Sequence, residues 1–261
     1  MKKKILAATV FLPVAAIAVT LLGSPVVQSA GPADPNREWR ISESDATRIV
    51  SDLTGVPDAD LTVNGSIDGA VSTAYTVEGP DVVAAVDVAT GRIGMLTING
   101  HVPSSARVRI SEGNALAIAK SFAAKARIDV GGRDVSVRLV DHDYNTEYVV
   151  MWTKRERGAL VPATTSISVN PDSGEVFSIV DISRPYDAPE EAAVSRDAAV
   201  HAAIQILDDT AVLQDSNLVV RFDLSGSQGL HWALKFTEGD PDGHVVGRVV
   251  FVDAMSGQVV D

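Results

Sequence analysis

The stretch "SVNPDSGEVFSI", Ser168 to Ile179, is a run of strand-forming residues interrupted by the turn-forming letters PDSG. It predicts a strand, a tight turn and a second strand. Two other stretches have nearly the same form: "AVDVATGRIGML", Ala85 to Leu96, and "VFVDAMSGQVVD", Val250 to Asp261. The glycines of the three turns are each separated by 83 residues: Gly91, Gly174 and Gly257. A fixed period of this length predicts tandem copies of one small domain.

Each turn is expected to be stabilised by its own residues. The polar residue that ends the first strand can accept hydrogen bonds from the backbone of the turn. These residues are Asp87, Asn170 and Asp253. The glycine then supplies the positive φ that a tight reversal requires.

A helix is predicted upstream of each turn. The three segments are "ISESDATRIVSDLTG", Ile41 to Gly55, "ISEGNALAIAKSFAAKA", Ile110 to Ala126, and "VSRDAAVHAAIQILDD", Val194 to Asp209. Each opens with a β-branched residue and a serine suited to cap a helix, namely Ser42, Ser111 and Ser195. Asp45 follows Ser42 at the spacing of a capping box.

Apolar residues follow each serine at helical spacing. The first stripe is Ala46, Ile49, Val50 and Leu53, and the second, in the same phase, is Ala115, Ile118, Ala119 and Phe122. The third stripe is expected one residue later, at Val200, Ala203, Ile204 and Leu207. Each helix therefore has one face to bury.

Strand-like segments around aromatic residues lie between each helix and its turn. They are centred on Tyr75, on Tyr148 with Trp152, and on Trp232 with Phe236. Trp152 and Trp232 are interpreted as core residues rather than ligand platforms. The predicted fold class is α+β, with tandem small domains that each pack one helix on an antiparallel β-sheet.

The predicted domains are residues 41–100, 106–183 and 191–261, joined by linkers rich in Pro, Ser and charge. Domains of this size are marginal alone, so neighbouring repeats are expected to pack together. A basic head, a long apolar body and a small-residue exit mark residues 1–30 as a secretory signal or a retained N-terminal anchor. Residues 31–40 are interpreted as a spacer. Both readings of the N-terminus predict a secreted or cell-envelope location.

The predicted exported part is acidic. Without Lys2, Lys3 and Lys4 it holds 19 basic and 34 acidic residues, a net charge of −15. This charge argues against broad binding to nucleic acid or to anionic membrane surfaces. The chain has no cysteine, so neither a lipoprotein anchor nor a disulfide can form.

The repeated unit resembles the PepSY domain of peptidase propeptides and a spore-germination protein. The resemblance rests on the helix openings "ISESDA", "ISEGNALAIA" and "VSRDAAVHAA", the strands "YTVEG", "YVVMW" and "HWALKF", and the hairpins "VDVATGRIG", "VNPDSGEVF" and "VDAMSGQVV". The family implies an extracytoplasmic fold of one helix against a small antiparallel sheet. In metalloprotease precursors such domains precede the catalytic domain, assist its folding and keep it inactive.

The resemblance implies a function without catalysis, because the family has no catalytic residues to carry over. No protease follows the repeats in this sequence, so inhibition is expected in trans. The predicted function is to bind an extracytoplasmic protease and inhibit or chaperone it, with a sheet edge as a possible docking strand. The alternative is a cell-envelope module that binds or senses a polymer or small ligand. An enzyme with its site between repeats is the third hypothesis.

Known catalytic motifs are absent from the sequence, and no cofactor is expected. The densest candidate metal ligands are "DHD", Asp141 to Asp143, which also suits a polar turn. The segment from Glu238 to Gly243 has the spacing of the start of an EF-hand loop, but Val249 stands where that loop needs a glutamate. A polar hairpin loop with at most weak calcium binding is the interpretation.

A small basic cluster stands out in this acidic chain. Lys154, Arg155 and Arg157 occur together in "TKRERG", at the predicted tip of a hairpin. They are candidate contacts for an acidic partner or an anionic envelope polymer. The simpler interpretation is a solvated tip whose charges prevent aggregation.

Overall fold

The computed structural model describes residues 41–68, 73–103, 107–142, 146–183, 185–223, 226–239 and 245–260. Within these residues the chain divides into two compact units. The N-terminal unit comprises residues 41–154 and 162–185, and the C-terminal unit comprises residues 155–161 and 186–260. The expected signal at 1–30 and spacer at 31–40 lie outside the described residues and stay predictions.

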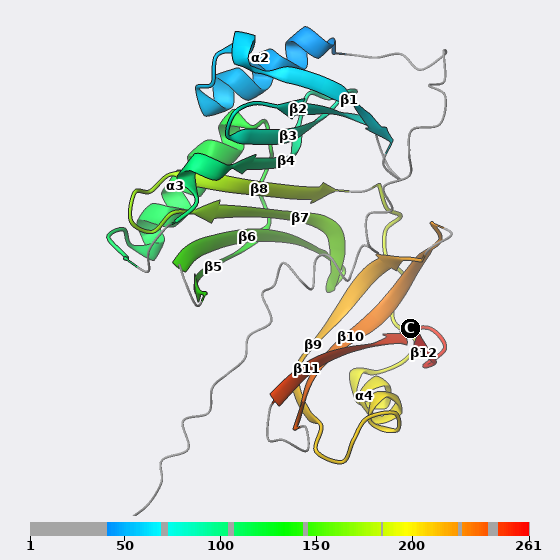
Figure 1. Cartoon of the computed structure of the whole chain (residues 1–261). Coiled ribbons are helices and arrows are strands. Elements are labelled where there is room, and N and C mark those ends of the chain that lie inside the picture. Colours follow the sequence, from blue (N-terminus) through cyan, green and yellow to red (C-terminus); the bar gives the residue numbers. More distant parts are fainter. Residues whose placement is uncertain are drawn as a thin grey trace, which may run out of the picture. The chain divides into compact units, whose positions relative to one another are not determined.

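The fold is a mixed α+β fold rich in strands, and in each segment predicted as a repeat a helix precedes several strands (Figure 1). The first repeat has α2 (Glu43–Thr54), η1 (Asp58–Asp60), β1 (Thr62–Asp68), β2 (Thr73–Glu78), β3 (Val82–Asp87) and β4 (Ile93–Ile98). The short helix η2 (Asn99–His101) follows β4, and the second repeat has α3 (Glu112–Lys125), β5 (Asp134–Asp141), β6 (Thr146–Glu156), β7 (Ala159–Val169) and β8 (Val176–Ser183). The third has α4 (Arg196–Ile204), β9 (Val212–Phe222), β10 (Gln228–Gly239), β11 (Val245–Asp253) and β12 (Val259–Val260).

The helix caps predicted from the sequence are confirmed. The hydroxyl oxygens of Ser42, Ser111 and Ser195 accept hydrogen bonds from backbone N–H groups three residues later. Asp45 completes the capping box by accepting from the Ser42 backbone N–H at 3.0 Å. The N–H groups at a helix start have no partner inside the helix, so these contacts define where each helix begins.

The closing turns are also confirmed. Asp87 accepts hydrogen bonds from the backbone of Ala89 and Thr90, and Asn170 and Asp253 accept equivalent bonds in their own turns. The glycines adopt the left-handed conformation, with φ values of 69°, 79° and 77° at Gly91, Gly174 and Gly257. An added Cβ is strained at such φ values, which explains glycine at all three positions.

The sheet of the N-terminal unit joins the first two repeats. Its strand order is β1-β2-β3-β4-β8-β7-β6-β5, and β4 pairs antiparallel with β8. Leu96 lies opposite Ile179, Met95 opposite Val180 and Thr97 opposite Ser178. The period of 83 residues makes Leu96 and Ile179 equivalent positions of the two repeats. The closing strands therefore pair about a local two-fold axis at these two residues.

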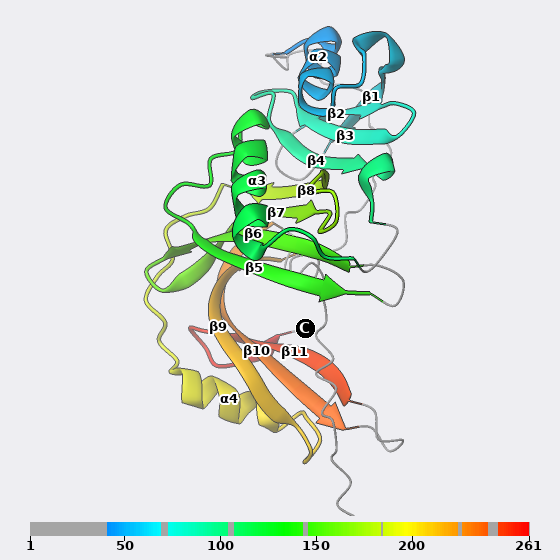
Figure 2. The same cartoon turned by 90° about the vertical axis from the view of Figure 1, so that its left-hand side faces the viewer.

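One face of this sheet carries the core of the N-terminal unit. Helix α2 contacts β1, β2 and β3, and α3 contacts β5 and β8 (Figure 2). Trp152 is 1% exposed in this core, as expected from the sequence. A row of completely buried side chains crosses the centre of the sheet: Ala84, Leu96, Ile179 and Ile167. Repeats one and two thus share a single core.

A buried polar network also joins the two repeats. Arg92, which follows the first closing turn, forms an ion pair with Asp181 on β8, whose side chain is only 3% exposed. The Thr165 hydroxyl donates to the second Asp181 oxygen at 2.6 Å and accepts from Arg133 at 2.9 Å. A buried carboxylate needs such partners, because an unpaired charge in the interior is strongly unfavourable.

The helices bury small residues at the same two positions. Four residues after each capping serine stand Ala46, Ala115 and Ala199, and eight residues after it stand Val50, Ala119 and Ala203. All six are completely buried. The most buried positions of the third stripe therefore keep the phase of the other two, and the predicted shift by one residue was wrong, although Ala203 is buried and Val200 and Leu207 pack against the core as expected. Ile204, placed in that stripe, ends α4 and is 46% exposed.

The C-terminal unit contains an antiparallel sheet in the order β9-β10-β11-β12. Helix α4 contacts β10 and β11, and Ala199, Ala203, Leu234, Phe236 and Val252 form the centre of its core. Trp232 packs partly buried against this core, as expected. No helix among the described residues is both long and apolar enough to cross a membrane.

Candidate functional site

The basic cluster predicted from the sequence lies on the β6–β7 hairpin, as expected. The two strands are connected through Arg157 and Gly158, which both adopt positive φ, at 49° and 82°. This is the backbone pattern of a tight two-residue hairpin turn. Lys154, Arg155 and Arg157 are all exposed. Residues 155–161 belong to the C-terminal unit, and the contacts below are within that unit.

The two arginines make contacts to their own unit. Arg155 donates hydrogen bonds to the Gly158 carbonyl at 3.2 Å and to Asn217 Oδ1 on β9 at 2.7 Å. Arg157 donates to the Pro189 carbonyl at 3.2 Å, in the segment that precedes α4. Both side chains are therefore oriented by intramolecular hydrogen bonds while they remain exposed, so the solvated tip and the partner contact both stay predictions.

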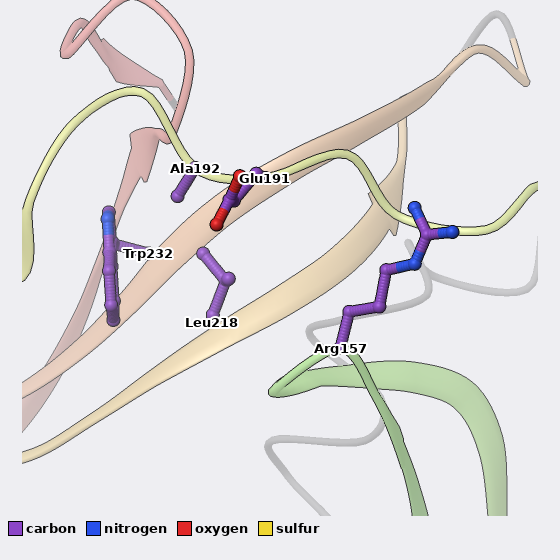
Figure 3. Close-up of a pocket in the computed structure, with 5 residues that line it drawn as sticks. All are labelled: Arg157, Glu191, Ala192, Leu218 and Trp232. Carbon is purple, nitrogen blue, oxygen red and sulfur yellow. The ribbon is translucent and has the colours of Figure 1, made fainter.

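A cavity of about 530 Å³ lies beside this hairpin end and is lined by Arg157, Glu191, Ala192, Leu218 and Trp232. Figure 3 shows Trp232 at one end of the lining and Arg157 at the other, with Leu218, Ala192 and Glu191 between them. The Trp232 indole N–H donates to the Val194 carbonyl at 2.9 Å, which fixes the ring orientation. The cavity thus combines a fixed aromatic surface with one guanidinium and one carboxylate group.

The chemistry of this cavity is suited to binding a ligand with both apolar and polar groups. Its lining combines two apolar side chains, Leu218 and Trp232, with the charged Arg157 and Glu191. Indole and leucine surfaces can contact the apolar face of a ring, while Arg157 and Glu191 can each bind a polar group. The cavity is therefore a candidate ligand site.

The most perturbed histidine of the C-terminal unit is separate from the cavity. His231 neighbours Trp232 on β10, so its side chain points to the opposite face of the sheet. Burial lowers the pKa of His231, the positive charge of Arg221 lowers it further, and Asp253 partly opposes both. Hydrogen bonds from Ser256 and Met255 overcome the effect of burial and hold the pKa of Asp253 below its usual value. Nearby, the Arg221 guanidinium lies 4.0 Å from the centre of the Phe251 ring.

The candidate metal ligands do not form a described cluster. His142 contacts Glu147 at 3.0 Å, whereas Asp143 lies outside the described residues. In the possible calcium loop, Glu238 lies on β10 with Arg248 3.8 Å away, and residues 240–244 are outside the description. Nowhere in the described ranges do three or more metal-binding side chains come together. The weak calcium site stays a prediction.

Three residues of the cavity were not singled out by the sequence. Glu191 and Ala192 belong to a linker, and Leu218 belongs to strand β9. The sequence around these three residues does not indicate a cavity, because the cavity forms only when their segments pack beside Trp232 and the hairpin end. Arg157 was singled out, but as an exposed contact rather than as part of a cavity wall.

Comparison with known proteins gives a likeness in structure but no match in sequence. No protein-family model matches the sequence, and no curated protein matches it. Among solved structures, the chain is similar to the Bacillus megaterium YpeB C-terminal domain, with 13% sequence identity and a TM-score of 0.48. The similarity covers 84% of this chain and 95% of that chain. At this identity and superposition, the likeness does not indicate what the present chain binds.

Proposed function

We propose that this chain is an exported, non-catalytic protein that binds an extracytoplasmic protease in trans and inhibits or chaperones it. The resemblance of its repeats to PepSY domains supports a protease as the partner. The repeated polar residues also support a role without catalysis. Ser42, Asp87 and their equivalents in the other repeats are used in helix caps and closing turns.

The observation that carries the proposal is the sheet face of the N-terminal unit that lies opposite the helices. Two rows of paired side chains cross its four central strands. The rows are Ala85–Met95–Val180–Ser166 and Val83–Thr97–Ser178–Ser168. All eight side chains are at least partly exposed, and Met95 and Val180 at the centre are 42% and 38% exposed. We name these eight residues the open face.

The composition of the open face suits a protein partner. None of its residues is charged, although the whole chain is 21% charged. The centres of protein interfaces are depleted in charge and enriched in methionine, and contiguous exposed apolar surface marks interaction sites. Small side chains around Met95 and Val180 would let a partner approach the sheet closely.

The experiment measures casein hydrolysis by the proteases that the producing cell secretes, with increasing amounts of the full chain. We expect hydrolysis to fall, or recovery of activity after protease refolding to rise. The Met95→Glu and Val180→Glu variants should each be about tenfold less potent, because burying a carboxylate at an interface centre costs about 1.4 kcal/mol or more.

Met255→Glu provides the matched control. The side chain of Met255 is 43% exposed, nearly the same fraction as the 42% of Met95. It lies in the third closing turn, however, and not on the open face. This variant should keep full potency. The proposal is wrong if the chain affects neither proteolysis nor refolding, or if the Met95→Glu variant is as potent as the unmodified chain.

A second candidate function is supported by the cavity in the C-terminal unit. Trp232 and Leu218 offer an apolar wall, and Arg157 offers a cation, as a sugar polymer with acidic groups would require. This supports an envelope-binding or sensing module. Co-sedimentation with purified cell wall distinguishes the two functions: Trp232→Ala should release the chain only if the wall is the ligand, whereas Met95→Glu should have no effect.

A further inference from the structure

Strand β5 forms an open edge of the N-terminal sheet. Among the described strands it pairs only with β6, and Figure 2 shows it as the outermost strand of that sheet. Its register with β6 is regular over all eight residues, from Asp134 opposite Thr153 to Asp141 opposite Thr146. An edge of this kind presents a row of backbone groups that another strand can pair with.

This edge has few of the features that usually prevent pairing. Strand β5 has no proline, no lysine and no bulge, and two of its three charged residues, Asp134 and Arg138, point to the face opposite its apolar side chains. By contrast, β1 at the other edge of the sheet has a register shift between Val63 and Ser66, where Gly65 adopts a φ of 115°. Natural proteins protect edges with such irregularities. The regular β5 edge is therefore suited to accept a partner strand.

The side chains of β5 continue the core to this edge. Val135, Val137 and Leu139 lie opposite Trp152, Val150 and Tyr148, all of which are buried under the helix side of the sheet. Val135 and Leu139 are each 44% exposed, although they point to the core face. A strand added beside β5 would cover them.

We propose that β5 pairs antiparallel with β5 of a second copy of this chain, about a two-fold axis at Val137. In this register Val137 lies opposite the partner's Val137, and Val135 lies opposite the partner's Leu139. All three apolar side chains of the core face then meet apolar side chains. The guanidinium of Arg133, immediately before the strand, donates to Thr165 on β7 of its own sheet at 2.9 Å, so the apolar pairs alone define this register.

Neighbouring registers fit less well. A shift of one residue would place the apolar side chains of β5 on the polar face of the partner strand. Centring the pair on Arg138 instead would bring the two copies of that arginine together. Centring it on Ser136 would put Leu139 opposite the partner's Arg133 and shorten the paired segment. The axis at Val137 alone pairs the full apolar set.

The fold already contains this kind of pairing. Strands β4 and β8 occupy equivalent places in repeats one and two, and they pair antiparallel about the axis at Leu96 and Ile179. The proposed β5 contact repeats that geometry between two molecules, with an apolar pair again on the axis. Closed two-fold contacts of this type are the commonest in homo-oligomers.

The test uses the absence of cysteine from the chain. In the Val137→Cys variant, the two thiols on the axis would lie on directly opposite residues, whose Cα atoms are about 4.5–5.5 Å apart in an antiparallel pair. This distance allows a disulfide. We expect mild oxidation of the full-length variant to give a covalent dimer, and the unmodified chain to sediment as a concentration-dependent dimer.

Two further variants define the register. In Val135→Cys the two thiols would be separated by four residues along the strands, about 13 Å, so no covalent dimer should form. In Val140→Lys the new lysine would lie opposite the partner's Asp134, so this variant should still dimerise. In Val137→Lys two lysines would meet on the axis, and the dissociation constant of the dimer should rise at least tenfold. Far-UV circular dichroism checks that each variant folds.

The competing occupant is an extended segment of a different protein. In that case the purified chain sediments as a monomer at all concentrations, and Val137→Cys gives no covalent dimer. Either result overturns the proposal, as does equal cross-linking through Val135→Cys and Val137→Cys. None of these outcomes bears on the open face, so the proposed protease binding is tested separately.

Discussion

At the scale of single residues, His231 connects pH to the stability of the C-terminal unit. It is partly buried on β10, and its ring lies against Gly229, whose backbone contact, like Asp253, favours the protonated form. Burial and Arg221 lower its pKa below the usual 6.5, while Asp253 acts in the opposite direction. At pH values between the pKa of His231 in the folded chain and its pKa in the unfolded chain, the unfolded chain binds more protons. Protonation of His231 therefore favours unfolding.

We predict that the stability contributed by neutral His231 is present above pH 6.5 and is lost as the pH falls through its folded pKa. Urea unfolding at pH 7.5 and pH 5.0 measures this loss. The pH window stays above the usual aspartate pKa of 3.8, so Asp253 contributes little change. In His231→Gln the fall in unfolding free energy between pH 7.5 and pH 5.0 should be smaller than in the unmodified chain. His201 is exposed on α4, and in His201→Gln the fall should equal that of the unmodified chain. An unchanged loss in His231→Gln would contradict the prediction.

The closing turns show which residue-scale features a sequence can predict. Asp87, Asn170 and Asp253 bind backbone atoms two and three residues away, so their contacts follow from local order alone. The caps at Ser42, Ser111 and Ser195 are predictable for the same reason. The cavity beside Trp232 was not predicted, because its walls come from four separate segments between Arg157 and Trp232 that meet only in the folded chain.

At the scale of elements, the helices are held close to their sheets by small residues. Ala115, Ala119 and Ala123 form a completely buried line along α3. The larger Ile118 and Phe122, which the sequence pattern placed in the same stripe, are only partly buried at its side. Apolar spacing identified the correct face, but it could not show that alanine sets the distance between helix and sheet.

We predict that Ala119→Leu destabilises the N-terminal unit by about 1–3 kcal/mol, because added methylenes have no space in a close-packed core. Ala124→Leu on the exposed side of the same helix is the control, and its effect should stay within about 0.5 kcal/mol. Chemical denaturation of both variants measures the difference. Equal stability of the two would mean that α3 does not pack as closely as the burial of Ala119 indicates.

At the scale of the whole molecule, the segments predicted as repeats one and two lie in one compact unit. The periodic sequence predicted three repeats and correctly placed their turns. It could not show that β4 and β8 pair, because strand pairing between repeats leaves no periodic signal. Only the general argument that small domains pack together pointed to this arrangement.

We predict that a cavity made in repeat one will loosen repeat two. Leu96→Ala removes a completely buried side chain at the local axis and should cost about 2–5 kcal/mol. Hydrogen exchange should then become faster in β7 and β8 as well as in β3 and β4, because these strands share one core. Strands β9 to β11 serve as the internal reference. Faster exchange restricted to residues 41–100 would show that the two repeats are independently stable.

The local axis at Leu96 and Ile179 also affects how the two repeats can diverge. Away from the axis, each residue of repeat one contacts neighbours that differ from those of its counterpart, so the two copies are free to drift apart in sequence. On the axis, each of the two residues is the other's neighbour, and a larger side chain in one copy requires a smaller one in the other. Substitutions at these two positions are therefore expected to depend on each other.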